Sequence, residues 1–364
     1  MIKYIDLEAQ RAVIQAEIRN NIDTVMSHGQ FILGPEVYLL EEKLSEYVGA
    51  KYCISCANGT DALQIALMAV GVGAGDEVIT PSFSYIAAAE AITLLGATPV
   101  YADVDPETCN INVGQLRNLI TDKTKAIVPV SLYGYPANFD VINPMADEFG
   151  IVVIEDAAQS FGASVDGKKS CNLSTIGCTS FFPTKPLGCY GDGGAIFTSD
   201  PHLGKKIRQI ATHGQNGKYN HELLGVNSRL DTLQAAILLP KLQILDGEIL
   251  KRQQLSELYN DALRSVFHVK TPAASPSVQS AWAQYTLQVD NRNQLQAFLK
   301  SHNIPTAVHY PRAVSDQPAV KDLAHEYPVS RRLAKSVISL PIHAYLSESN
   351  ISHIVDLIRS FYTK

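Results

Sequence analysis

The stretch from residue 51 to residue 199 alternates short apolar runs with helical segments, and this alternation constrains the fold more than any other feature. Several of the runs are apolar throughout rather than at every second position, which is typical of strands buried on both faces. The predicted strands lie at residues 52–55, 77–80, 99–102, 126–130, 151–155, 179–182 and 195–198. We therefore expect an α/β fold with a mostly parallel sheet that is covered by helices.

The sequence also predicts a second, smaller domain. Residues 230–263 are rich in Leu, Ile, Ala, Gln and Glu at helical spacing, and we expect one or two long helices that join two domains. The prolines of residues 271–276 interrupt this pattern, and residues 284–289 alternate as a half-buried strand. We predict a large domain over residues 1–250, whose N-terminal helix can pack on the small domain, and a small α+β domain over residues 251–364.

Composition and charge exclude several classes of partner. The 364 residues carry a formal net charge of -6 at pH 7 and no basic stripe that could contact nucleic acid. No stretch reaches the roughly 20 apolar residues of a membrane span, and the first six residues lack the apolar core of a signal peptide, so we expect a cytoplasmic protein. The cysteines lack the paired spacing of a zinc site, and His213 with His221 would make a poor one, so we expect no metal.

Polar and charged residues follow several predicted strands, at the edge of the sheet where open α/β folds bind ligands. Gly59 and Thr60 open a helix after the first strand, and the free N–H groups and dipole of such a helix end attract a phosphate. Tyr85 follows the second strand and could stack on a flat heteroaromatic ring. Asp156 ends a buried strand, so its carboxylate requires a cationic partner.

A carboxylate and a lysine at the ends of two strands can hold the two ends of pyridoxal phosphate. Asp156 would keep the pyridine nitrogen protonated, and Lys185 would store the aldehyde as an imine. Gln159 and Ser180, close to them in the sequence, could contact the ring hydroxyl and the phosphate. The pattern therefore indicates amino-group chemistry.

Each of these residues also has a simpler interpretation. Thr60 could be an ordinary helix N-cap, Tyr85 a packed core residue and Lys185 a surface lysine. Asp156 could be the ribose-binding acid of a dinucleotide fold, but the expected Gly-x-Gly-x-x-Gly turn upstream of it is missing. Pyridoxal phosphate accounts for Asp156, Gln159, Ser180 and Lys185 together, and a nicotinamide dehydrogenase stays as a remote alternative.

Six segments resemble the DegT/DnrJ/EryC1/StrS family of sugar aminotransferases, and the resemblance covers nearly the whole chain. These enzymes use pyridoxal phosphate and have the fold-type I, or aspartate aminotransferase-like, architecture, in which the large domain contains a mostly parallel seven-stranded sheet. The segments that carry the resemblance are residues 31–36, 58–63, 155–159, 180–185, 191–194 and 225–230. The resemblance implies the same fold and cofactor for this chain.

The resemblance assigns roles to individual residues. Lys185 matches the lysine that binds the cofactor covalently, Asp156 the acid that pairs with the pyridine nitrogen, and Gln159 a residue near the ring hydroxyl. Tyr85 takes the position of the stacking aromatic. The residues implied to hold the phosphate are Gly59, Thr60, Ser180 and, from the neighbouring subunit, Asn227. The last contact implies a homodimer with shared active sites.

The type of residue at position 185 distinguishes two activities within the family. Members with histidine at that position dehydrate the sugar, so the lysine favours transamination, and the resemblance implies L-glutamate as the amino donor. Ser131 stands where many relatives have a histidine, which leaves the role of that position open.

The resemblance extends to the acceptor. Residues 51–66, 171–198 and 226–242 are similar to the family members that aminate the 3-keto group of a UDP-linked 2-acetamido-2-deoxy-hexuluronic acid, in the synthesis of bacterial O-antigen and other lipopolysaccharide sugars. The diphosphate and carboxylate of that sugar need cationic or multi-donor contacts. The candidates for these contacts are Arg229, His309, Tyr310 and His213.

Three alternatives stay open. Arg229 could form a structural ion pair with Asp231 or another acid instead of contacting a substrate. The acceptor could be a 4-keto-6-deoxy nucleotide sugar. The chain could also be a catalytically silent regulator on the same fold.

Overall fold

The computed structural model describes residues 2–363, and its centre is a seven-stranded sheet in the order β1-β9-β8-β5-β4-β2-β3. Neighbouring strands are parallel, except that β9 runs antiparallel to both β1 and β8. The strands are β1 (Tyr52–Cys56), β2 (Glu77–Pro81), β3 (Thr98–Ala102), β4 (Thr124–Ile127), β5 (Val152–Asp156), β8 (Ile176–Ser180) and β9 (Gly194–Thr198). The predicted mostly parallel sheet of seven strands is confirmed.

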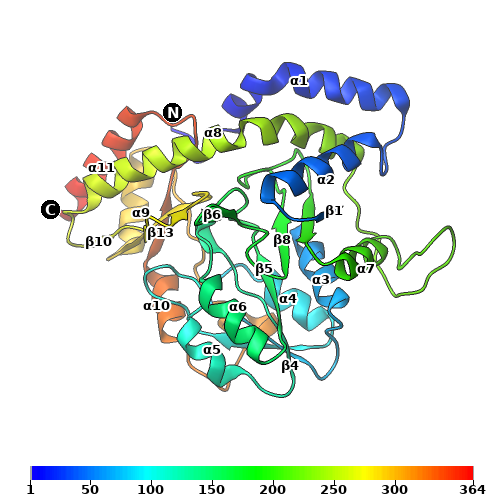
Figure 1. Cartoon of the computed structure of the whole chain (residues 1–364). Helices are drawn as coiled ribbons and strands as arrows, with labels where there is room; N and C mark the ends of the chain where they lie inside the picture. The colour runs from blue at the N-terminus through cyan, green and yellow to red at the C-terminus, as the bar shows by residue number, and fades with distance from the viewer. Residues whose placement is uncertain (1, 364) are drawn as a thin grey trace.

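Helices cover both faces of this sheet (Figure 1). Because successive side chains of a strand point to opposite faces, Ile154 joins one apolar cluster with α3, α4 and α7, whereas Val153 joins another with α5 and α6. A third cluster packs α2 against the sheet on the same side as α5 and α6. The helices are α2 (Pro35–Val48), α3 (Gly59–Ala69), α4 (Ala87–Leu94), α5 (Val113–Leu119), α6 (Phe139–Glu148) and α7 (Pro201–Ala211).

The predicted helical stretch near residues 230–263 forms one helix, α8 (Thr232–Leu263), of 32 residues. Figure 1 shows α8 running from the sheet to the C-terminal helices, with α1 (Leu7–His28) along its first part. Ile14 and Ile18 of α1 pack against Ile237 of α8. The long helix thus contacts the N-terminal helix, the large sheet and the C-terminal region.

The C-terminal region has its own antiparallel sheet, β10-β12-β13, and its own apolar cluster, which includes Tyr259 from α8. A further small sheet, β11-β6-β7, joins this region to the segment after β5. The elements are β6 (Ser164–Val165), β7 (Lys168–Lys169), β10 (Val269–Lys270), β11 (Val278–Gln279), β12 (Tyr285–Val289), β13 (Val337–Leu340), α9 (Arg292–Ser301), α10 (Pro328–Ser336), α11 (Glu348–Tyr362) and the short 3-10 helices η1 (Leu132–Gly134), η2 (Val314–Asp316) and η3 (Pro318–Val320).

Two predicted strands end earlier than expected. The strand predicted at residues 126–130 stops at Ile127, two residues before Pro129, which has no N–H group to donate. The strand predicted at residues 179–182 is β8, which ends at Ser180, so Lys185 lies in the loop that follows rather than at a strand end. In residues 2–363 there is no helix of the length and apolarity that a membrane crossing requires.

Candidate active site

A cavity of about 490 Å³ lies at the carboxyl ends of β1, β5 and β8, where a parallel sheet gathers the residues that follow its strands. Most of the predicted site residues line it: Gly59, Thr60, Tyr85, Asp156, Gln159, Ser180, Lys185, His309 and Tyr310. Asn227, Arg229 and His213 do not. The fold therefore brings together the implied cofactor residues except Asn227, and it leaves Arg229 and His213 of the implied substrate set outside.

One end of the cavity is the start of α3. Asn58 is the N-cap, since its Oδ1 accepts a hydrogen bond from the N–H of Asp61 at 2.8 Å, so Thr60 is not the cap. A Cβ atom on Gly59 would lie 2.6 Å from the Cβ of Ser180 and 3.2 Å from its hydroxyl, so only glycine fits there. The glycine lets the Ser180 hydroxyl approach the positive end of the helix, and this end of the cavity suits an anion.

Asp156 lies in the wall of the cavity, at the end of β5. Its side chain is buried, and its Oδ1 accepts one hydrogen bond, from the N–H of Ala158 at 3.1 Å. Burial raises the pKa of this carboxyl, while the Ala158 N–H and the positive charge of Lys185 lower it. A second cation placed against Asp156 would favour the ionised form further.

Lys185 lies in the same wall, in the loop after β8. Burial lowers the pKa of its amine below that of an ordinary lysine, and the charge of Asp156 opposes this shift. Burial and the positive charge of Lys185 also lower the pKa of His309. A lysine with a lowered pKa has more of the neutral amine, which can act as a base or a nucleophile.

Aromatic and amide side chains form the rest of the wall. The amide nitrogen of Gln159 donates to the hydroxyl of Tyr310 at 3.1 Å, and its oxygen accepts from the N–H of Tyr133 at 2.8 Å. The rings of Tyr85 and Tyr310 lie 6.0 Å apart between centroids. Because Tyr85 is 59% exposed, the alternative that it is a packed core residue is wrong.

A second carboxylate, that of Glu155, lies behind the cavity wall on the opposite face of β5. It is fully buried and accepts hydrogen bonds from Ser131 Oγ at 2.8 Å, Ser170 Oγ at 2.6 Å and the N–H of Cys171 at 2.8 Å. Ser131, where many relatives have a histidine, therefore contacts this rear carboxylate. Asp156 accepts fewer hydrogen bonds although it belongs to the same strand.

Three predicted residues lie on the segment between α7 and α8 instead. His213 and Asn227 are exposed there, and Ser228, next to Asn227, accepts a hydrogen bond from the N–H of Ala57 at 3.0 Å. Within the described residues no ion pair joins Arg229 to Asp231, so the structural alternative for this arginine finds no support. The segment is hydrogen-bonded beside the end of β1, but these three residues do not line the cavity of their own chain.

Sequence reasoning missed several residues of the site. Gln284, just before β12, lines the cavity, and its Oε1 is buried without a hydrogen-bond partner in the chain. The hydroxyl of Tyr133 donates to the backbone carbonyl of His309. No sequence signal marked Gln284, because a single glutamine before a strand is common. Tyr133 was easier to find, because it lies two residues after Ser131, a position that the resemblance had already marked.

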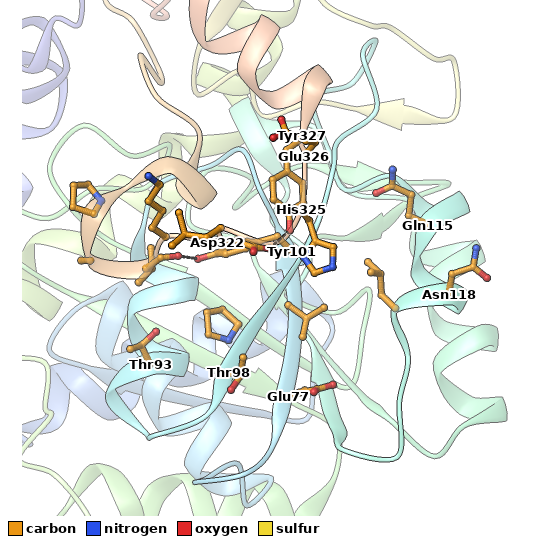
Figure 2. Close-up of a pocket in the computed structure, with 18 of the residues that line it drawn as sticks. Glu77, Thr93, Thr98, Tyr101, Gln115, Asn118, Asp322, His325, Glu326 and Tyr327 are labelled. Atoms are coloured by element: carbon orange, nitrogen blue, oxygen red, sulfur yellow. Dashed lines mark hydrogen bonds and ion pairs between the residues drawn. The ribbon is translucent and has the colours of Figure 1, made fainter.

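A larger cavity, of about 1000 Å³, lies at the edge strand β3 and contains none of the predicted site residues (Figure 2). Its labelled side chains come from β2, α4, β3, α5 and the segment just before α10. The Tyr101 hydroxyl donates to the carbonyl of Val320, and the Tyr327 hydroxyl donates to Asp322. Cavity size alone therefore does not identify the functional site.

Comparison with known proteins decides the family. The model of the DegT/DnrJ/EryC1/StrS aminotransferase family matches residues 12–359. This chain belongs to that family. Over 354 residues it is 58% identical to the UDP-2-acetamido-2-deoxy-3-oxo-D-glucuronate aminotransferase of Pseudomonas aeruginosa. The aligned residues make up 97% of this chain and 98% of the relative.

Solved structures of family members agree with this fold. A DegT DnrJ EryC1 StrS aminotransferase from Brucella abortus superposes with a TM-score of 0.97 at 43% identity, over 100% of both chains. NtdA from Bacillus subtilis, solved with its bound cofactor PMP, superposes with a TM-score of 0.90 at 30% identity, over 96% of this chain and 82% of that one. The expected α/β, fold-type I architecture is confirmed.

As a member of the DegT/DnrJ/EryC1/StrS family, the chain is an aminotransferase that depends on pyridoxal phosphate. The donor set of the cavity fits that cofactor. The start of α3 and the Ser180 hydroxyl suit its phosphate, the buried carboxylate of Asp156 suits a protonated ring nitrogen, and the Lys185 amine suits its aldehyde. The unpartnered Oε1 of Gln284 offers a further acceptor inside the cavity.

Proposed function

We propose that this chain transfers an amino group from L-glutamate to the 3-keto group of a UDP-linked 2-acetamido-2-deoxy-hexuluronic acid, in the cytoplasm, for bacterial surface polysaccharide synthesis. The choice of acceptor rests on the 58% identity with the Pseudomonas aeruginosa enzyme named for such a sugar. The observation that carries the chemistry is the cavity that places the Lys185 amine and the Asp156 carboxylate in one wall.

The proposed roles follow from the chemistry of these side chains. Bound pyridoxal phosphate supplies an electron sink and a carbonyl group that exchanges nitrogen with the substrates. Asp156 holds the proton on the ring nitrogen, where a carboxylate in a buried site attracts a cation strongly. The Nζ atom of Lys185 moves the proton to and from the substrate carbon, and its lowered pKa increases the share of the free base.

The remaining wall residues orient the cofactor and the sugar. We assign Gly59, Thr60 and Ser180 to the phosphate, Tyr85 to stacking on the ring and Gln159 to the ring hydroxyl. Gln159 is held from both sides by Tyr133 and Tyr310, so its amide has little freedom to rotate. We assign His309 and Tyr310, which also line the cavity, to the sugar.

We propose a homodimer in which Asn227, Arg229 and His213 act on the cavity of the partner subunit. These residues lie outside the cavity of their own chain, and their segment carries Tyr219 and Leu224, which are 81% and 90% exposed. Large apolar side chains exposed together indicate a contact surface. Further exposed apolar residues on α1 and α2 are Val13, Met26, Tyr38 and Leu39.

We also propose that the chain is organised as a large cofactor-binding domain over residues 1–250 and a small domain over residues 251–364. The C-terminal apolar cluster supports this division, because it draws its α8 residues from Leu255, Tyr259 and Leu263. The proposed boundary lies within α8, so the helix would connect the two domains without a flexible linker.

Product analysis tests the acceptor. The purified protein is incubated with pyridoxal phosphate, L-glutamate and either the UDP-linked 3-keto uronate or a 4-keto-6-deoxy nucleotide sugar, and the amino sugar is identified by mass spectrometry and NMR. We expect kcat/KM to favour the uronate by about 100-fold or more, because a site that binds a buried carboxylate discriminates against a sugar without one. A preference for the 4-keto sugar would contradict the proposed acceptor, and Lys185→Ala serves as the inactive control.

A further inference from the structure

Lys241 is a buried lysine that the reaction does not use. It lies in α8 with only 2% of its surface exposed, and its Nζ donates a hydrogen bond of 2.6 Å to the backbone carbonyl of Gly188. The same nitrogen lies 4.2 Å from the centre of the Tyr190 ring. In residues 2–363 it has no carboxylate within ion-pair distance, and burying a cation without such a partner is unfavourable unless its contacts compensate.

The carbonyl that Lys241 holds belongs to the turn that carries Lys185. A Cβ atom on Gly188 would lie 2.5 Å from the carbonyl oxygen of Pro183 and 2.7 Å from that of Phe182. The end of the turn therefore packs directly on its beginning, and the N–H of Lys185 closes the turn by donating to the carbonyl of Phe182 at 2.9 Å. Any movement of Gly188 would change the backbone on which Lys185 stands.

A second side chain of α8 holds the same loop. The Oε1 of Gln234 accepts from the N–H of Tyr190 at 2.9 Å. Gln234 and Lys241 are seven residues apart, which places them two turns apart on one face of the helix. The loop from Lys185 to Tyr190 is thus hydrogen-bonded to α8 by two side chains, the neutral Gln234 and the charged Lys241.

We propose that Lys241 is a positioning residue for Lys185: its amine fixes the carbonyl of Gly188 and so holds the turn that presents Lys185 to the cavity. The effect on catalysis rests on the proposed function, since it takes Lys185 as the residue that binds the cofactor. The anchoring itself does not, because it concerns the polypeptide alone.

Hydrogen–deuterium exchange of the cofactor-free protein tests the anchoring. We expect Lys241→Met to speed exchange of the amides of Lys185 and Cys189 about tenfold, since a hydrogen bond from a charged donor is lost, while the amides of β5 exchange as in the wild type. The matched control is Lys251→Met, which removes a half-buried lysine from the same helix. Lys241→Arg keeps the charged donors and should stay within about threefold of the wild type.

The affinity for pyridoxal phosphate gives the second readout. The same Lys241→Met protein should bind the cofactor about tenfold more weakly, with Lys241→Arg close to the wild type. Unchanged exchange at residues 181–191 would overturn the proposal, and so would exchange that rises equally over the whole chain. Changed exchange with unchanged cofactor affinity would keep the anchoring but contradict the role of Lys185.

A variant pair covers the case in which Lys241→Met does not fold. Lys241→Arg and Lys241→Gln both place a donor in the site, but the glutamine is uncharged and shorter. We expect the arginine protein to match the wild type in exchange at residues 181–191 and the glutamine protein to exchange faster there. Equal exchange in both, at the wild-type rate, would overturn the proposal.

Discussion

The two faces of β5 carry adjacent buried carboxylates whose surroundings differ. On the cavity face, Asp156 accepts one hydrogen bond, from the N–H of Ala158, and burial raises its pKa. On the rear face, Glu155 accepts hydrogen bonds from Ser131, Ser170 and the N–H of Cys171. A carboxylate with several donors is stabilised by the protein, whereas one with a single donor has capacity left for a ligand.

The partly buried Lys185 and the buried Lys241 differ in the same way. The amine of Lys185 faces the cavity, and its lowered pKa reflects burial that only Asp156 opposes. The amine of Lys241 faces away from the cavity and is bound to a backbone carbonyl and a tyrosine ring. Burial lowers the pKa of Lys241 to about 8, but its amine is already engaged by the carbonyl of Gly188 and the ring of Tyr190. The comparison separates groups that act on a ligand from groups that hold the cavity in shape.

The largest expected effect is on the cavity face, at Lys185. Lys185→Ala removes the amine that moves the proton, so kcat should fall by about four orders of magnitude. The free energy of unfolding should change little, because the lost attraction to Asp156 is offset by the removal of a charge whose burial is unfavourable. Steady-state kinetics with L-glutamate and urea unfolding measure the two quantities. A variant with more than a tenth of the wild-type kcat would contradict the role of Lys185.

Asp156→Asn should have the second-largest effect on kcat. The amide cannot hold a positive ring nitrogen, so kcat should fall by about 100-fold to 1000-fold, while the hydrogen bond from Ala158 can be kept. Steady-state kinetics of the cofactor-saturated variant measure this loss. A decrease of less than about fivefold would mean that the carboxylate does not act on the ring.

The same substitution has a pH-dependent effect on stability. Because burial raises the pKa of Asp156 in the folded protein, its ionisation disfavours folding as the pH rises above about 4. Cofactor-free Asp156→Asn should therefore be more stable than the wild type at pH 7, and the difference should shrink as the pH falls toward 4. Urea titrations across this range test the sign, and a difference that grows toward low pH would contradict it.

Glu155 should affect stability more than catalysis. Glu155→Ala leaves the buried N–H of Cys171 and two serine hydroxyls without their acceptor, so the free energy of unfolding should fall by about 3 kcal/mol. Glu155→Gln is the matched control, because it keeps an acceptor and should recover most of the loss. Chemical denaturation measures both variants. If Glu155→Ala reduced kcat as much as Asp156→Asn does, the distinction between the two faces would be wrong.

Ser131→Ala should have the smallest effect. It removes one of the three donors to Glu155, so the free energy of unfolding should fall by about 1 kcal/mol, with kcat within about twofold of the wild type. Chemical denaturation and steady-state kinetics on one protein preparation measure the free energy of unfolding and kcat. A large loss of kcat would give Ser131 a role in the reaction that its contacts on the rear face do not predict.

The sheet could be predicted because its strands are apolar on both faces, and the cavity because its residues follow those strands. Strand ends were less predictable. Lys185 was expected at the end of a strand, but β8 ends at Ser180, and the N–H of Phe181 turns to the carbonyl of Gly193. The sequence alone does not show where a strand stops pairing with its neighbours when the side chains beyond its end are still apolar.

The supporting residues could not be predicted. Lys241 lies in a long helix, where a lysine is normally expected to be exposed, and the packing of α8 on the loop from Lys185 to Tyr190 buries it. Gln284 joins the cavity from the C-terminal region, which the sequence placed in another domain. Both depend on contacts between distant segments, and no local pattern records such contacts.

The most direct test is borohydride reduction of the protein loaded with pyridoxal phosphate, followed by peptide mapping. Lys185 lines the cavity, whereas the buried Lys241 does not. We predict that the label is found on the peptide containing Lys185 and is absent from the peptide containing Lys241. A label on Lys241, on another residue or on none would contradict the assignment of Lys185 to the cofactor.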